Sequence, residues 1–185
     1  MKGSVMRYVL RLSVTLFLIT GLMAGVLGLV HGATAPKIAA AQAAKTKKAL
    51  SAVLPDGENA QKLSEFPDET DLVEAVYASP AGYAVTVAPV GFDSPITMMV
   101  GVDPEGRVLG ISVISHKETP NLGAVAADPG PKGQDFRSQY VGVSGAVSLG
   151  KDGGTLDAIT GATITSRAVT EGVNAALDCV RQLTQ

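Results

Sequence analysis

The stretch from Leu12 to Val30 most limits how this chain can fold, because its 19 residues contain no charged side chain. As a helix, an apolar run of this length crosses the hydrocarbon core of a bilayer, which is about 30 Å thick. Lys2, Arg7 and Arg11 precede the run with no acidic residue among them, and this bias leaves the N-terminus in the cytoplasm. We therefore predict a single-pass membrane protein whose remaining residues fold outside the cytoplasm.

A cleaved signal peptide is the alternative for this segment, because the small residues Ala33, Thr34 and Ala35 resemble a cleavage site. Two features favour a retained anchor. The apolar run is longer than the core of a typical signal peptide, and Pro36 would directly follow the scissile bond, where it makes a poor substrate. We expect the segment to remain as a transmembrane helix.

Pro55-Asp56-Gly57 ends an Ala- and Lys-rich stretch whose composition is typical of helix. The predicted organisation is a cytoplasmic N-terminus at 1–11, the transmembrane helix at 12–30, a juxtamembrane helix or linker at 31–55 and an extracytoplasmic domain at 56–185. All 17 acidic residues but only 12 of the 15 basic residues follow residue 11, so the net charge there is 12 − 17 = −5. This balance disfavours a nucleic-acid partner.

The residues beyond 80 predict an α+β domain with a mainly antiparallel sheet. Alternating apolar residues from Gly82 indicate a half-buried strand. Two β-prone runs joined by Asp103-Pro104-Glu105-Gly106 indicate a hairpin with a type I turn. The further elements expected, in chain order, are strands at 96–102 and 108–115, a loop at 116–133, a short helix at 135–140, a strand at 141–149, a glycine-rich turn at 150–154 and a helix at 167–183.

The last helix is predicted to be amphipathic and to pack against the sheet. The single cysteine, Cys179, falls in this helix, where a buried small apolar side chain is the ordinary interpretation. No CxxC motif and no histidine or acidic cluster with ligand spacing occurs, so no metal site is predicted. The apolar stripe of the helix consists of Val169, Val173, Ala176, Leu177 and Val180.

A hydroxyl-rich segment, 157–166, stands directly before the predicted helix. Free N–H groups and the helix dipole favour an anion such as phosphate at a helix N-terminus, and Gly161-Ala162 lets a bulky group approach the backbone. Arg167 could add a charge-assisted hydrogen bond. The residues alone leave a second interpretation open, in which Thr165 or Ser166 simply caps the helix.

The segment Asp157-Ala158-Ile159-Thr160-Gly161-Ala162-Thr163 resembles the flavinylation motif, Asp-x-x-Ser/Thr-Gly-Ala-Thr, of FMN-binding domains in bacterial redox pumps. The resemblance implies FMN held as a phosphodiester on Thr163 and attached outside the cytoplasm by a flavin transferase that uses FAD. For Asp157 it implies recognition by the transferase or support of the loop, while a turn-forming role stays open. The other cofactor-binding residues that it implies are Thr160, Gly161, Ala162, Thr165 and Ser166.

A second segment, His116-Lys117-Glu118-Thr119-Pro120-Asn121-Leu122-Gly123, is similar to His-x-Glu-Thr-Pro-Gly-Leu-Gly of the G subunit of the Rnf electron-transport complex. Asn121 replaces the usual glycine, and since asparagine tolerates positive φ, the turn can persist. The resemblance implies that Glu118 and Thr119 border the flavin ring. The residues alone would instead make His116 and Glu118 exposed loop residues.

The two segments together identify the chain as a member of the FMN-binding domain family, which includes the Rnf G subunit and the related C subunit of the Na⁺-translocating NADH:quinone reductase. The length of the chain suits the Rnf G subunit. The resemblance implies an electron-carrying subunit of a membrane-bound, ion-translocating ferredoxin:NAD oxidoreductase. The other subunits of the complex would be its partners, and no catalytic residue of its own is expected. Two alternatives are an exported FMN carrier, such as the quinone reductase subunit, and a flavin-free anchored binding module.

Overall fold

The computed structural model describes residues 2–184, with side chains from residue 6 onward, and forms two compact units, Met1–Ala44 and Lys45–Gln185. Helix α1, Lys2–Val53, forms the first unit and contributes its last turns to the second. Large apolar side chains are exposed along α1 as far as Ile38. Within the described residues it is the one helix long and apolar enough to cross a membrane.

The predicted junction between the membrane span and the juxtamembrane helix is not visible as a break in α1. Pro36 lies inside the helix, where it has no N–H to donate to the carbonyl of the preceding turn. The helix then continues to Val53, and the turn at Pro55-Asp56-Gly57 follows as expected.

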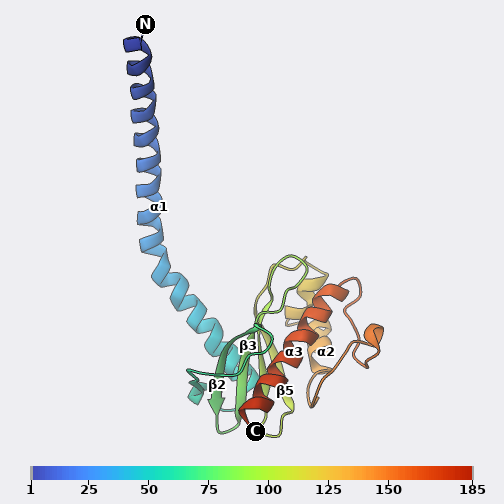
Figure 1. The fold of residues 1–185 in the computed structure, drawn as a ribbon. Helices are drawn as coiled ribbons and strands as arrows, with labels where there is room; N and C mark the ends of the chain where they lie inside the picture. The colour runs from blue at the N-terminus through green and yellow to red at the C-terminus, as the bar shows by residue number, and fades with distance from the viewer. Residues whose placement is uncertain (1, 185) are drawn as a thin grey trace. The chain divides into compact units, whose positions relative to one another are not determined.

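The second unit is built on an antiparallel sheet whose strands are neighbours in chain order (Figure 1). The hairpin expected around Asp103-Pro104-Glu105-Gly106 is confirmed, with Val100 opposite Ile111 in its register. The sequence analysis missed the first two strands. Within residues 2–184 the five strands are β1 (Gln61–Lys62), β2 (Val73–Ser79), β3 (Gly82–Val87), β4 (Thr97–Val102) and β5 (Val108–Ser115).

Both faces of the sheet are covered, which makes this unit three-layered. Helix α3, Thr163–Leu183, packs on one face over β2, β3 and β4 (Figure 1). The last turns of α1 cover the other face, where Leu50 and Val53 join Ala84 and Met99 in a small apolar cluster. Strand β3 was expected to be half-buried, and this was wrong, because helices cover it on both sides.

The segment between β5 and α3 differs most from expectation. The loop expected at 116–133 contains a 3₁₀ helix, Gly123–Ala127, and helix α2, Pro131–Ser138, begins inside it. Proline is favoured in the first turn of a helix, so α2 starts earlier than predicted. The strand expected at 141–149 is wrong, since this stretch makes only isolated bridges and contains Gly142 and Gly145 at positive φ.

Helix α3 confirms the predicted apolar stripe, since Val169, Val173 and Val180 are almost completely buried. Cys179 is also buried, as expected, and burial raises the pKa of its thiol to about 11. Helix α2 is followed by Tyr140, whose buried hydroxyl shares a 2.9 Å hydrogen bond with Thr170 of α3. These contacts fix α3 against the sheet and set the position of its first turn.

A substitution at the β4–β5 turn tests the hairpin. Burial opposes ionisation of Asp103, but hydrogen bonds from the Arg107 N–H (2.7 Å) and guanidinium (2.8 Å) outweigh it and lower the pKa of Asp103. We expect Asp103→Asn to lower the free energy of unfolding by about 1–2 kcal/mol at pH 7.

The folded-state pKa of Asp103 lies below its ordinary value of 3.8, so this stabilisation exists above that pH and disappears as the pH falls through the folded-state pKa. Urea unfolding of the full chain in detergent, followed by circular dichroism, should give a wild-type-to-variant difference that shrinks below pH 4. A difference independent of pH would contradict this assignment.

Candidate functional site

The N-terminus of α3 has no side-chain cap among the residues that the structure describes. Ala162 occupies the N-cap position, and Thr163 is the first helical residue. Within residues 2–184, the N–H groups of Thr163, Ile164 and Thr165 donate to no acceptor. Gly161 precedes them with φ of 79°, a left-handed conformation that glycine adopts without strain. Unpaired N–H groups at a helix start form a site for an anion.

The hydroxyls of Thr165 and Ser166 were candidates for the helix cap, and this expectation was wrong because α3 begins before them. Ser166 Oγ donates to the Ala162 carbonyl at 2.9 Å and accepts the Ile159 N–H at 2.9 Å, which ties the preceding loop to the first turn. Thr165 Oγ1 donates to Glu118. Both hydroxyls therefore hold neighbouring segments in place instead of capping the helix.

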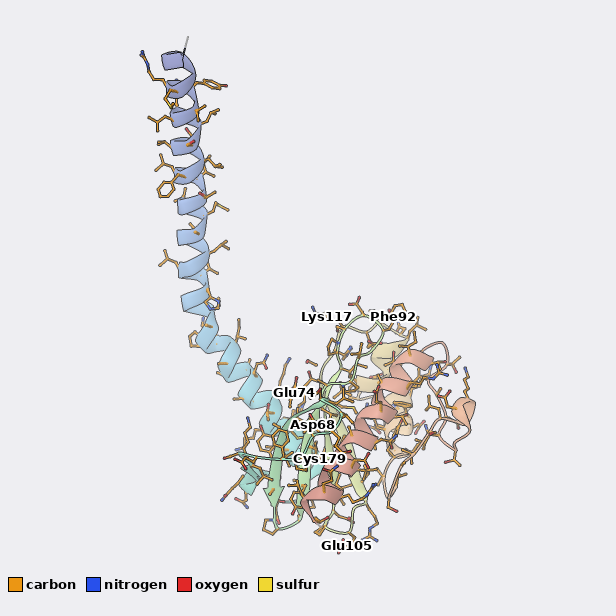
Figure 2. The ribbon with its side chains drawn as sticks, viewed as in Figure 1. Asp68, Glu74, Phe92, Glu105, Lys117 and Cys179 are labelled. Atoms are coloured by element: carbon orange, nitrogen blue, oxygen red, sulfur yellow. The ribbon has the colours of Figure 1, made fainter. Side chains whose placement is uncertain are left out.

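A cavity of about 350 Å³ opens beside this helix start. Three large apolar side chains on its wall are unusually exposed for such residues: Phe92 (66%), Leu122 (42%) and Ile164 (50%). Figure 2 shows Phe92 near Lys117, at the end of the unit opposite Glu105 in the β4–β5 turn. The lining residues are Phe92, Glu118, Thr119, Leu122, Gly123, Lys151, Gly161, Ala162, Thr163, Ile164 and Thr165.

The carboxylate of Glu118 holds three distant segments together under this cavity. One oxygen accepts the Phe92 N–H at 2.9 Å, and the other accepts the Thr165 hydroxyl. The Glu118 N–H donates in turn to Nδ1 of His116 at 3.2 Å. Glu118 is only 6% exposed, so its interpretation as an exposed loop residue was wrong.

Glycines on two sides make room for this buried carboxylate. A Cβ atom at Gly91 would collide with one oxygen of Glu118, and a Cβ atom at Gly123 would collide with the other and with Thr165 Oγ1. The backbone therefore approaches the carboxylate closely from both the 91–94 loop and the 116–123 segment. This packing places Phe92 and Leu122 on the cavity wall.

Lys151 is the cation at the cavity. Its Nζ donates to Thr163 Oγ1 at 3.3 Å. Arg167, expected to face the anion, instead makes a bidentate pair with Asp152, with hydrogen bonds of 2.8 and 2.6 Å. The hydrogen bonds of this pair lower the pKa of Asp152 and raise that of Arg167.

The structure divides most of the residues singled out by the sequence between two cavities, and Ser166, which is completely buried, lines neither. Thr163, Gly161, Ala162, Thr165, Glu118 and Thr119 line the first. Asp157 and Thr160 line a second cavity, also of about 350 Å³, together with Asn121 and part of α2. Asn121 has φ of 59°, the left-handed conformation expected of the residue that replaces glycine there.

Sequence reasoning missed Lys151, Phe92, Leu122 and Ile164. Phe92 and Lys151 lie 71 and 12 residues before Thr163 in the sequence, so only the fold brings them together. A phenylalanine in the loop-forming stretch Gly91-Phe92-Asp93-Ser94-Pro95, in a chain with 4% aromatic residues, was the one available indication.

This combination of an apolar wall, a threonine hydroxyl and a cationic, uncapped helix start fits FMN, whose flat aromatic ring has a large apolar surface and whose phosphate is anionic. A model of the FMN-binding domain matches residues 91–178, and a model described as the RnfG N-terminal region matches residues 1–53. The class defined by fold and site is therefore an FMN-binding domain on an N-terminal apolar helix.

Curated relatives identify the family. The chain is 32% identical over 177 residues to the G subunit of the ion-translocating oxidoreductase complex of Methanosarcina acetivorans, covering 90% of this chain and 92% of the relative. It is 33% identical over 194 residues to that of Pseudomonas aeruginosa, with coverage of 96% and 91%. The G subunit of the proton-translocating ferredoxin:NAD(+) oxidoreductase complex of Clostridium ljungdahlii is 38% identical over 102 residues, 55% of each chain. The chain belongs to the RnfG family, the G subunits of ion-translocating oxidoreductase complexes.

Removal of the Glu118 carboxylate tests its role in holding the cavity wall. Glu118→Ala leaves the Phe92 N–H and the Thr165 hydroxyl without their buried acceptor, at an expected cost of about 2–3 kcal/mol of stability. Hydrogen exchange of the 91–94 amides in the full chain should accelerate more than exchange in β4. The exposed acid Glu105, in the opposite turn, provides a control as Glu105→Ala. Unchanged exchange at 91–94 would exclude the proposed bridging role.

Proposed function

We propose that this chain is the electron-carrying G subunit of a membrane-bound, ion-translocating ferredoxin:NAD oxidoreductase complex and holds FMN covalently on Thr163. The observation that carries the proposal is the position of Thr163. Its hydroxyl stands at the uncapped start of a 21-residue helix, on the wall of a cavity with an apolar side and a lysine. Family membership and the FMN-binding match support the same assignment.

The attachment is a phosphoryl transfer without redox change. The Thr163 hydroxyl attacks the phosphorus on the FMN side of FAD, so that a new Thr163 Oγ–P bond forms. The pyrophosphate P–O bond breaks, AMP leaves with the bridging oxygen, and the hydroxyl proton is released to solvent. A flavin transferase, the maturation partner implied by the motif, would catalyse this step. A side chain at Gly161 would crowd Leu122, since an added Cβ would lie 3.1 Å from Leu122 Cδ2, so the glycine leaves more room at this part of the cavity.

Once bound, FMN supplies one- or two-electron transfer, the chemistry of a relay between neighbouring cofactors. The residues of this chain hold and shield the group. The apolar side chains of Phe92, Leu122 and Ile164 would cover the ring, and the free N–H groups of the first turn of α3 would bind the phosphate. A covalent tether removes the entropic cost of rebinding the cofactor. Other subunits of the complex supply the remaining redox centres.

The proposed topology places the N-terminus in the cytoplasm and Thr163 on the outer side of the membrane. Support comes from Lys2, Arg7 and Arg11 before the apolar stretch and the absence of acidic residues there. This side is also where the implied transferase works. The anchor and the modified threonine are thus compatible with each other.

Substitution of Thr163 tests the proposal. The full chain is co-expressed with its flavin transferase, and its intact mass and in-gel fluorescence are measured after denaturation. Wild type should carry the mass of one FMN less one water, and Thr163→Ala should lose the increment completely because no nucleophile remains. Thr163→Ser should retain part of it, and Thr155→Ala, an exposed threonine outside the motif, should load normally. Flavin remaining on Thr163→Ala, or absent from wild type, would refute covalent attachment at Thr163.

A further inference from the structure

We propose that Lys151 is the positioning cation for the phosphoryl group at Thr163 and that the Asp152–Arg167 pair holds it there. This inference rests on the covalent attachment proposed above and adds a residue that neither sequence motif contains. The observations that carry it are the contact of Lys151 with Thr163, the lack of a competing carboxylate and the fixed position of the turn that bears the lysine.

The first observation is the contact itself. Lys151 Nζ lies 3.3 Å from Thr163 Oγ1, the atom that would bond to phosphorus, and both residues line the same cavity. Across residues 2–184 no carboxylate lies within ion-pairing distance of Lys151. Asp152 is close enough for the Lys151 charge to help lower its pKa, but both of its oxygens accept from Arg167, so the ammonium group remains available to a phosphate.

The second observation concerns Arg167, the obvious alternative cation. Arg167 is one helical turn beyond Thr163, on the same face of α3. Both oxygens of Asp152 accept from its guanidinium in a bidentate arrangement, at 2.8 and 2.6 Å. Because its guanidinium is already paired with Asp152, Arg167 is not free to bind the phosphate. Its role is to hold the 150–152 turn, which carries Lys151, in place.

The third observation is how the turn is fixed. Lys151 lies in the 3₁₀ segment Gly150–Asp152, between buried Leu149 and the residue that pairs with Arg167. The Gly150 N–H donates to the Leu156 carbonyl at 2.8 Å, which anchors the start of the turn. With both ends held, the backbone at Lys151 has a defined position relative to the first turn of α3. The backbone therefore adds little to the entropic cost of bringing the lysine to the phosphate, and the remaining cost is the ordering of its side chain.

The role proposed for Lys151 follows from the opposite charges of its ammonium group and the phosphoryl group. A phosphodiester on Thr163 carries one negative charge, and the reacting phosphoryl group carries more during transfer. The Lys151 ammonium and the unpaired N–H groups at the start of α3 would face this charge from different sides. Lys151 binds and orients the phosphoryl group, and no proton leaves it in this step. Since the lysine is exposed to solvent, its effect should be sensitive to salt.

Loading kinetics of the full chain test the role. The chain in detergent is mixed with flavin transferase and FAD, and the covalent FMN fraction is followed by intact mass. We expect Lys151→Gln to slow loading roughly tenfold and Lys151→Arg to restore most of the rate, since the positive charge returns. Lys62→Gln, which removes another exposed lysine, from edge strand β1, should load at the wild-type rate. The thermal unfolding temperature of all three variants should equal that of wild type.

Two further measurements separate charge from structure. Raising the salt concentration to about 1 M shortens the Debye length to about 3 Å, so the difference between wild type and Lys151→Gln should narrow. Asp152→Asn should slow loading less than Lys151→Gln does. Adding Asp152→Asn to Lys151→Gln should slow loading little further, because the Asp152–Arg167 pair acts only by positioning the lysine.

The outcomes are distinguishable. If wild type carries no covalent FMN, the proposed attachment itself fails. If wild type loads and Lys151→Gln loads equally fast, the attachment stands and the role of Lys151 is refuted. Equal slowing by Lys151→Gln and Lys151→Arg, with a lowered unfolding temperature, would reduce Lys151 to a structural part of the turn and would also overturn the inference.

Discussion

The buried carboxylate of Glu118 is the interaction on which the arrangement of the site depends. It accepts from the backbone of the 91–94 loop and from Thr165 of α3, and it lies between two glycines that leave space for it. A buried acid of this kind must be satisfied by donors, and here the donors come from two segments that are distant in the sequence, the 91–94 loop and α3. The cavity wall is therefore assembled by one side chain that does not need to touch the cofactor to determine its surroundings.

Within the described part of the chain, the first turn of α3 lacks a side-chain cap, a feature that the stability of the helix does not explain. Helices usually begin with a residue whose side chain accepts a free N–H, and Ala162 cannot do so. The missing cap leaves donors directed at the cavity, while Ser166 and Thr165 use their hydroxyls to brace the loop and Glu118. At the helix start the N-cap position thus carries a small apolar residue, Ala162, while the hydroxyls of Thr165 and Ser166 are engaged with neighbouring segments. Such an exchange of stability for a binding surface is typical of functional helix starts.

The sequence predicted the elements whose patterns are local, such as the apolar stripe of α3, the β4–β5 hairpin and the apolar N-terminal helix. Strand β2 was missed because Glu74 interrupts its apolar run, and the strand expected at 141–149 failed because two glycines there adopt positive φ. For the site, too, the sequence predicted only what a local pattern carries. A contiguous motif identified Thr163, whereas Phe92 and Lys151 reach the cavity only through tertiary contacts.

The burial of Cys179 has a consequence for chemical durability. Its side chain belongs to the buried apolar core, and burial raises its pKa to about 11, which leaves almost no thiolate at neutral pH. Oxidants react with the thiolate of an accessible cysteine, and this side chain offers neither charge nor access. An FMN-binding domain of this kind therefore keeps its single cysteine unreactive. Oxidants should therefore leave this side chain, and the packing of α3 around it, unchanged.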